Sequence, residues 1–147
     1  NELFKPNALI LGYPILDAYQ FAVRNLKRKK EMQPLLEMMI SVAFGYSKPD
    51  KDRMDEWNCL KRITTYMPRT FLWMTSEDSL VDVEDGLDLV KALISAGVSY
   101  EFHVFQKGTH GMALGNPSVG DGESARERCG NQYEWVRLAL HWLKGFV

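Results

Sequence analysis

Two residues whose types could do chemistry together are an aspartate and a histidine, each in a turn that follows a predicted strand. Asp78 lies in "TSEDSLV" and His110 lies in "KGTHG". A carboxylate bonded to one imidazole nitrogen fixes the tautomer of the ring and leaves the other nitrogen free to take a proton. The pair therefore predicts catalysis in which His110 is the general base, Asp78 orients it, and a hydroxyl or thiol attacks the substrate.

Three apolar segments are predicted to be the strands that position this pair: "ALILGYP" (8–14), "TFLWMTS" (70–76) and "SYEFHVFQ" (99–106). The first is a continuous apolar run, which is typical of a strand buried on both faces. Asp78 follows the second strand and His110 follows the third. In a parallel sheet, ligands bind at the carboxyl ends of the strands, so we expect both side chains at the same edge.

Two helices are predicted beside these strands. Residues 83–97 repeat apolar side chains at helical spacing, and residues 132–146 place several large ones on one face. The first set is Val83, Leu87, Val90, Leu93 and Ile94, and the second is Trp135, Leu138, Ala139 and Trp142. Strands that alternate with helices favour an α/β fold with a parallel, doubly wound sheet and right-handed crossovers.

The segment from Asp17 to Met67 is too long for an ordinary connection between two strands. It contains helix-compatible apolar spacing, so we expect a helical insertion at about 17–67 that lies over a cleft. Packing is the default role for its aromatic residues Tyr46 and Trp57. Lining an acyl or sugar pocket is the alternative.

The other titratable residues are better explained by structural roles. Glu77 and Asp82 are rival acids beside Asp78, but the turn offers one inward position, so we expect both at the surface. His103 occupies an alternating position within the third predicted strand, and His141 lies on the last predicted helix. These positions favour structural roles for both.

Composition excludes several classes of function. The 147 residues carry a formal net charge of -1. This charge creates no strong electrostatic field that would attract nucleic acid or an anionic membrane. No apolar stretch is long enough to span a bilayer. Cys59 and Cys129 have no metal-ligand spacing, so we expect two free thiols, no metal and no cofactor. Unpaired cysteines favour the cytoplasm, although a leader sequence could precede residue 1.

Several stretches together resemble the C-terminal half of α/β-hydrolase esterases, most closely the bacterial acetyl esterase or acetyl-xylan-esterase-like branch. They are "PNALILGYP", the run from "RTFLWMTSEDSLV" through "FQKGTHGMAL", and "WVRLALHWL", with the elements T-x-x-D-x-x-V and K-G-x-H-G. The resemblance implies that Asp78 is the acid and His110 the base of a catalytic triad. It also implies that residues 1–147 are the C-terminal part of a single domain.

The nucleophile has no candidate in this sequence. Such hydrolases carry it in a G-x-S-x-G elbow ahead of the acid and the histidine, whereas the 147 residues contain no such elbow and no HGG-type oxyanion turn. We therefore expect the nucleophile to precede Ala8 in the complete fold. We also expect an exposed strand edge at Ala8 to Pro14, which the missing N-terminal half or a partner chain would cover.

The resemblance implies a carboxylic ester hydrolase that acts on small acyl esters, with acetylated carbohydrate as the suggested substrate, and a chain that is inactive by itself. Within the enzyme class, a serine peptidase or a dienelactone-type hydrolase uses a similar C-terminal half. A non-catalytic binding or regulatory module derived from this fold is the alternative from outside that class.

Overall fold

The computed structural model describes residues 5–28, 30–114 and 130–145. The chain divides into two compact units. The sheet unit comprises Asn1–Pro14 and Ile63–Val147, and the helical unit comprises Ile15–Arg62.

The sheet unit contains three parallel strands, β1 (Ala8–Gly12), β2 (Arg69–Thr75) and β3 (Tyr100–Phe105), in the order β1-β2-β3. Leu9 of β1 lies opposite Thr70 of β2, and Thr70 lies opposite Tyr100 of β3. The predicted parallel α/β sheet is therefore confirmed. Because β2 and β3 are neighbours, the turns that follow them lie at the same edge.

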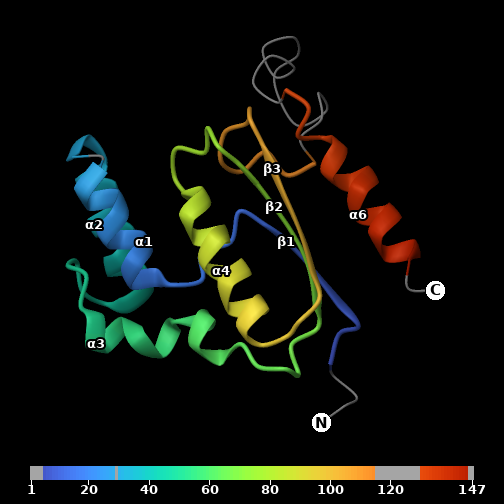
Figure 1. Cartoon of the computed structure of the whole chain (residues 1–147). Coiled ribbons are helices and arrows are strands. Elements are labelled where there is room, and N and C mark those ends of the chain that lie inside the picture. The colour runs from blue at the N-terminus through green and yellow to red at the C-terminus, as the bar shows by residue number, and fades with distance from the viewer. Residues whose placement is uncertain (1–4, 29, 115–129, 146–147) are drawn as a thin grey trace. The chain divides into compact units, whose positions relative to one another are not determined.

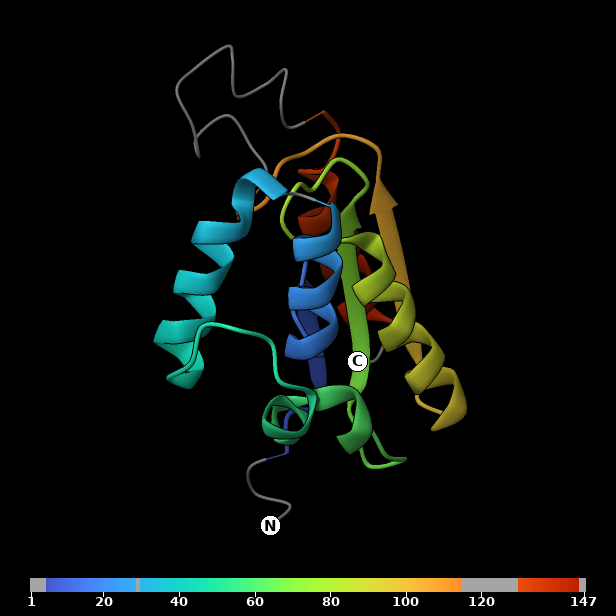
Figure 2. The ribbon, with the colours of Figure 1, turned by 90° about the vertical axis from the view of Figure 1, so that its left-hand side faces the viewer.

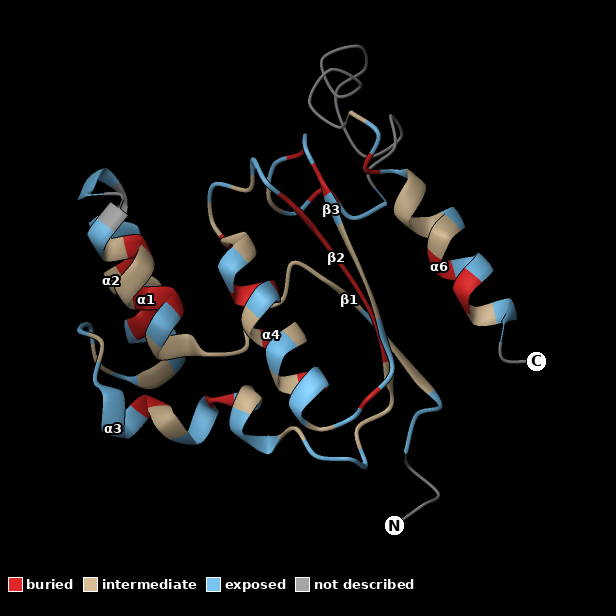
Figure 3. Ribbon diagram, in the orientation of Figure 1, coloured by how far each residue is buried: buried red, intermediate tan, exposed pale blue. Residues whose placement is uncertain are grey.

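Helices α4 (Val83–Ser95) and α6 (Glu134–Lys144) cover opposite faces of this sheet (Figures 1 and 2). The central strand β2 is buried along almost its whole length (Figure 3). Its residues Phe71 and Trp73 form a core with Ala139 and Trp142 of α6. The face that was predicted for the last helix is thus the one that packs.

On the opposite face, α4 approaches the sheet at a glycine. A Cβ atom added to Gly86 would lie 2.3 Å from the sulfur of Met74, so only a residue without a side chain allows this approach. The buried stripe of the helix contains Gly86, Leu89 and Leu93. The predicted stripe was wrong at Leu87 and Ile94, which are exposed, because the close approach at Gly86 sets which side of the helix faces the sheet.

The prediction that the first strand is buried on both faces was also wrong. Ile10 is 41% exposed, and the other residues of β1 are only partly buried. Within the described residues, β1 pairs with β2 alone and forms an edge of the sheet. The exposed strand edge expected at Ala8 to Pro14 is therefore present over Ala8–Gly12.

The helical unit has a small core of Ala22, Ile40 and Met54. Asp17 joins its first and last parts, because one carboxylate oxygen accepts from the amide of Gln20 at 2.9 Å and the other from the side chain of Asn58 at 2.6 Å. The elements are α1 (Ala18–Arg28), η2 (Lys30–Met32), α2 (Gln33–Phe44), α3 (Lys51–Met54), η3 (Asp55–Trp57) and η4 (Cys59–Arg62). The expected place of this segment over a cleft stays a prediction.

Among the described residues, no helix is both long and apolar enough to cross a membrane.

Candidate active site

Asp78 is held rigidly in the turn after β2. Its Oδ1 atom accepts hydrogen bonds from the backbone amides of Leu80, at 2.8 Å, and Val81, at 3.0 Å. The side chain is only 1% exposed. These two amide donors fix the orientation of the carboxylate and leave Oδ2 to accept one more hydrogen bond.

That bond comes from His110. Its Nδ1 atom lies 2.9 Å from Oδ2 of Asp78, which confirms that the two predicted side chains are within hydrogen-bond reach. Since an ionised carboxylate can only accept, this contact assigns the proton to Nδ1 and leaves Nε2 as the basic nitrogen. The ring is 31% exposed, so a reactant can approach it. The catalytic role of the pair stays a prediction.

The turn that carries His110 depends on glycine. Gly108 and Gly111 have φ values of 136° and 77°, which non-glycine residues rarely adopt. The hydroxyl of Thr75, at the end of β2, donates to the carbonyl oxygen of Gly108 at 2.6 Å. The T-x-x-D-x-x-V element therefore contributes one contact from each fixed position: Thr75 ties the two turns, Asp78 bonds His110, and the amide of Val81 bonds Asp78.

Sequence reasoning missed Gln132, which is fully buried behind this turn. A Cβ atom on Gly108 would lie 1.9 Å from its Oε1 atom. Neither polar atom of this side chain has a hydrogen-bond partner in the part of the chain that the structure describes. No pattern in the sequence distinguishes this glutamine, because its burial depends on the packing of distant segments.

Sequence reasoning also missed Tyr13. Its ring lies 4.8 Å from the ring of His110 and 4.9 Å from that of Trp73, centre to centre. One available signal was its position directly after the first strand, the same criterion that selected Asp78 and His110. Residues of three successive strand ends thus meet at one edge of the sheet.

The rival acids do not share this geometry. Glu77 is exposed. Asp82 caps the N-terminus of α4, where its side chain accepts from the amide of Glu84 at 3.0 Å. Glu77 thus lies at the surface as predicted, whereas Asp82 is half-buried at the start of α4.

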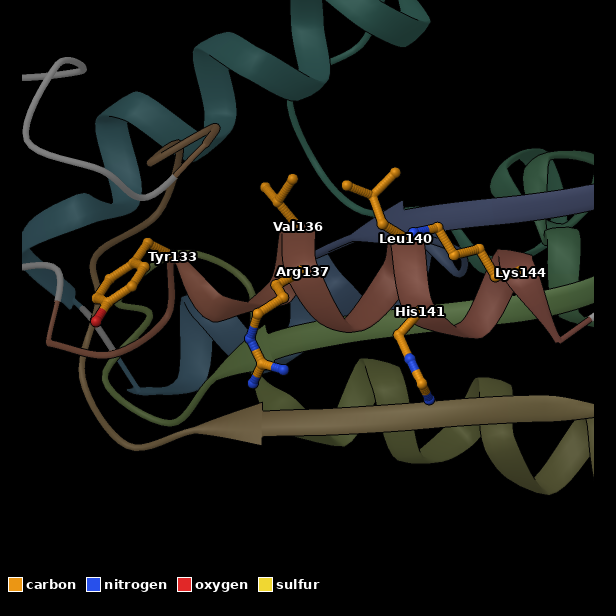
Figure 4. Close-up of a pocket in the computed structure, with 6 residues that line it drawn as sticks. All are labelled: Tyr133, Val136, Arg137, Leu140, His141 and Lys144. Carbon is orange, nitrogen blue, oxygen red and sulfur yellow. The ribbon is translucent and has the colours of Figure 1, made fainter.

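The other two histidines lie elsewhere in the sheet unit. His103 on β3 contacts Glu101 through Nε2 at 2.6 Å, and its ring packs on Phe71 and Phe105. His141 is exposed on α6 and lines a surface hollow of about 410 Å³. Figure 4 shows that all six residues lining the hollow lie on or just before this helix: Tyr133, Val136, Arg137, Leu140, His141 and Lys144. The hollow contains neither member of the Asp78–His110 pair.

Two further cavities contain aromatic residues. One is apolar, has a volume of about 310 Å³ and lies beside the ring of Tyr13. Its lining residues are Ile10, Gly12, Tyr13, Trp73, Ala113, Leu114 and Trp135. Another, of about 410 Å³, lies within the helical unit, and Tyr46 and Trp57 both line it. There the Arg53 guanidinium stands 3.8 Å above the ring of Tyr46. The pocket-lining alternative considered for Tyr46 and Trp57 is therefore compatible with their positions.

Across residues 5–28, 30–114 and 130–145, no group of three or more His, Cys, Asp and Glu side chains could hold a metal ion. Cys59 is a free, exposed thiol. Cys129 lies outside the described residues.

Comparisons with known proteins agree with the fold. Residues 1–114 match the family described as the alpha/beta hydrolase fold. An endo-1,4-beta-xylanase B of Butyrivibrio fibrisolvens is 24% identical over 136 residues, which are 92% of this chain and 19% of the xylanase.

Solved structures give the same result. The acetyl ester-xyloside bifunctional hydrolase of Caldicellulosiruptor lactoaceticus aligns with a TM-score of 0.68 and 28% identity over 95% of this chain and 42% of its own. A carboxylesterase of Lactobacillus plantarum aligns with a TM-score of 0.67 and 25% identity over 96% of this chain and 45% of its own. The chain thus spans less than half the length of these relatives. Since the family match covers most of its residues, the chain belongs to the α/β-hydrolase family.

Proposed function

We propose that this chain supplies the acid and the base of a serine ester hydrolase. The observation that carries the proposal is the bond between His110 and Asp78. The carboxylate is buried and held by two backbone amides, while the imidazole bonds to it through Nδ1 and its side chain is 31% exposed. This is the arrangement that a general base needs, because the acid fixes the tautomer and stabilises the imidazolium that forms.

The nucleophile in this proposal is a serine outside the 147 residues, in a strand-to-helix elbow. His110 Nε2 takes the proton of its hydroxyl as the oxygen attacks the ester carbonyl carbon. Backbone N–H groups outside this chain hold the resulting oxyanion. The imidazolium then gives its proton to the leaving alcohol, and the C–O bond of the ester breaks. Water, activated by the same nitrogen, releases the acid and restores the serine.

The substrate in this proposal is a small acyl ester, with acetylated carbohydrate as the preferred class. The similarity to a hydrolase named for acetyl ester and xyloside substrates and to a xylanase supports this choice. The reaction needs no metal or cofactor, because the charge in the transition state is met by hydrogen-bond donors and the imidazolium.

The test compares two proteins in the hydrolysis of p-nitrophenyl acetate: this chain, and an extended protein in which a segment with a G-x-S-x-G elbow precedes it. We expect turnover only by the extended protein. His110→Ala should lower its kcat by about 10²- to 10⁴-fold, whereas the control His141→Ala should not change it. Turnover by the 147-residue chain that depends on His110 would contradict an external nucleophile.

The same protein separates the ester hydrolase from its alternatives. Release of acetate from acetylated xylan, with no cleavage of peptide or dienelactone substrates, supports the proposed substrate class. An extended protein with an intact elbow and no hydrolysis of any of these would favour a non-catalytic module.

A further inference from the structure

Two non-glycine residues in the described part of the chain have a positive φ, Tyr13 at 40° and Ala113 at 47°. This conformation is uncommon for residues with a side chain and gathers at functional sites, where surrounding contacts hold it. The two residues bond to each other, since the amide of Ala113 donates to the hydroxyl oxygen of Tyr13 at 3.2 Å. The strained positions are therefore one feature that joins distant parts of the sequence.

Both of these residues are held further by the core. The amide of Tyr13 donates to the carbonyl oxygen of Trp73 at 3.0 Å, which extends the pairing of β1 with β2 by one residue. The carbonyl oxygen of Ala113 accepts from the indole N–H of Trp135 at 3.0 Å. The rings of Trp73 and Trp135 stack with centres 5.2 Å apart. Hydrogen bonds therefore hold both the amide and the carbonyl group of Ala113, in the segment that follows His110.

Tyr13 also contacts His110 directly. The two rings lie 4.8 Å apart at an interplanar angle of 63°, an edge-to-face arrangement. The bond to Asp78 reaches the ring at Nδ1 alone. Gly108 and Gly111 flank the histidine in conformations that few other residues adopt, and the hydrogen bond from Thr75 holds this turn at Gly108 and not at the histidine itself.

We propose that Tyr13 is a positioning residue for His110. Its ring restrains the imidazole plane, and its hydroxyl anchors the segment that follows, so that Nε2 points steadily at the reacting hydroxyl. The proposal rests on the proposed function for its catalytic consequence but not for its structural one. A misplaced general base lowers the rate of proton transfer more than substrate affinity.

The experiment uses Tyr13→Phe, which keeps the ring and removes the hydroxyl, and Tyr13→Ala, which removes both. The matched control is Tyr133→Phe, which removes a hydroxyl from an exposed tyrosine at the start of α6. Hydrogen exchange of the Ala113 amide and the ¹⁵N shifts of the His110 ring are measured first, because neither needs activity. In the extended protein, kcat and KM for p-nitrophenyl acetate follow.

In Tyr13→Phe, we expect exchange of the Ala113 amide to rise about five- to tenfold, as for loss of one hydrogen bond. We expect kcat to fall by a similar factor with KM unchanged. Tyr13→Ala should lower kcat further and broaden the His110 ring signals, and Tyr133→Phe should match the wild type. Unchanged exchange in Tyr13→Phe would overturn the proposal whether or not the extended protein is active. Raised exchange with a normal kcat in both variants would overturn it as well.

If activity survives His110→Ala, the proposed function fails, whereas the exchange and ring signals still decide whether Tyr13 holds this loop.

Discussion

The hydroxyl of Thr75 and the carbonyl of Gly108 are joined by a buried hydrogen bond of 2.6 Å that ties the end of β2 to the turn after β3. Thr75→Val keeps the shape of the side chain but leaves this carbonyl without its donor, which costs about 1–3 kcal/mol. We expect the free energy of unfolding, measured by urea denaturation, to fall by that amount. Ser76→Ala is the control, since the hydroxyl of Ser76 makes its bond to Gln106 at an exposed position. An equal loss of unfolding free energy in both variants would contradict the prediction that the buried hydrogen bond contributes more than the exposed one.

Gly108 should tolerate no side chain for two separable reasons. Alanine there would strain the backbone at a φ of 136° and place its Cβ 1.9 Å from Oε1 of Gln132, and overpacking typically costs about 1–3 kcal/mol. In Gly108→Ala with Gln132→Ala, the clash with Gln132 is absent, whereas the backbone strain and a close contact of 2.8 Å with Cγ2 of Thr75 remain. A double-mutant cycle of unfolding free energies should therefore show a favourable coupling between the two substitutions. Gly97→Ala is the reference for strain alone, because nothing lies within 4 Å of its added Cβ. Additive losses would show that the clash is relieved without cost.

Asp78→Asn should abolish most activity of the extended protein while the turn is kept. The amide oxygen can still accept from Leu80 and Val81, but the NH₂ group then faces His110 and favours the tautomer with its proton on Nε2. We expect kcat to fall by about 10³- to 10⁴-fold, as for a triad with the wrong tautomer. Asp82→Ala should instead lower stability by about 0.5–2 kcal/mol through loss of the α4 cap and leave kcat intact. A reversed pattern would make Asp82 the functional acid.

The isolated 147-residue chain should self-associate through β1. This edge strand is apolar, whereas β3, at the other edge of the sheet that the described residues form, carries Glu101 and His103. Apolar edges are the ones that pair with other chains. Ile10→Lys places a charge on β1 and should lower light scattering at a given protein concentration. Val104→Lys on β3 is the matched control at a similarly exposed position. If it has the same effect, association does not depend on β1.

The sheet and the Asp78–His110 contact could be predicted because both follow from local patterns. Apolar runs define the strands, and parallel neighbours must bring the residues after them to one edge. The exposure of Ile10 could not be predicted, since an apolar run does not show whether a neighbouring strand is present. The roles of Tyr13 and Gln132 depend on contacts with residues far along the chain, which no local period encodes.

The two contacts that secure the turn of His110 differ in the length of chain they enclose, which has a kinetic consequence. Thr75 and Gly108 are 33 residues apart, whereas Tyr13 and Ala113 are 100 apart. Closing the longer loop costs about 1 kcal/mol more in chain entropy, so we expect β2, α4 and β3 to assemble first and β1 to join later. Pulsed hydrogen exchange during refolding should then protect the amide of Ser76, which bonds to Phe105, before that of Ala113. In this order of folding, the contact between Asp78 and His110 forms early, and the contact between Tyr13 and His110 forms last.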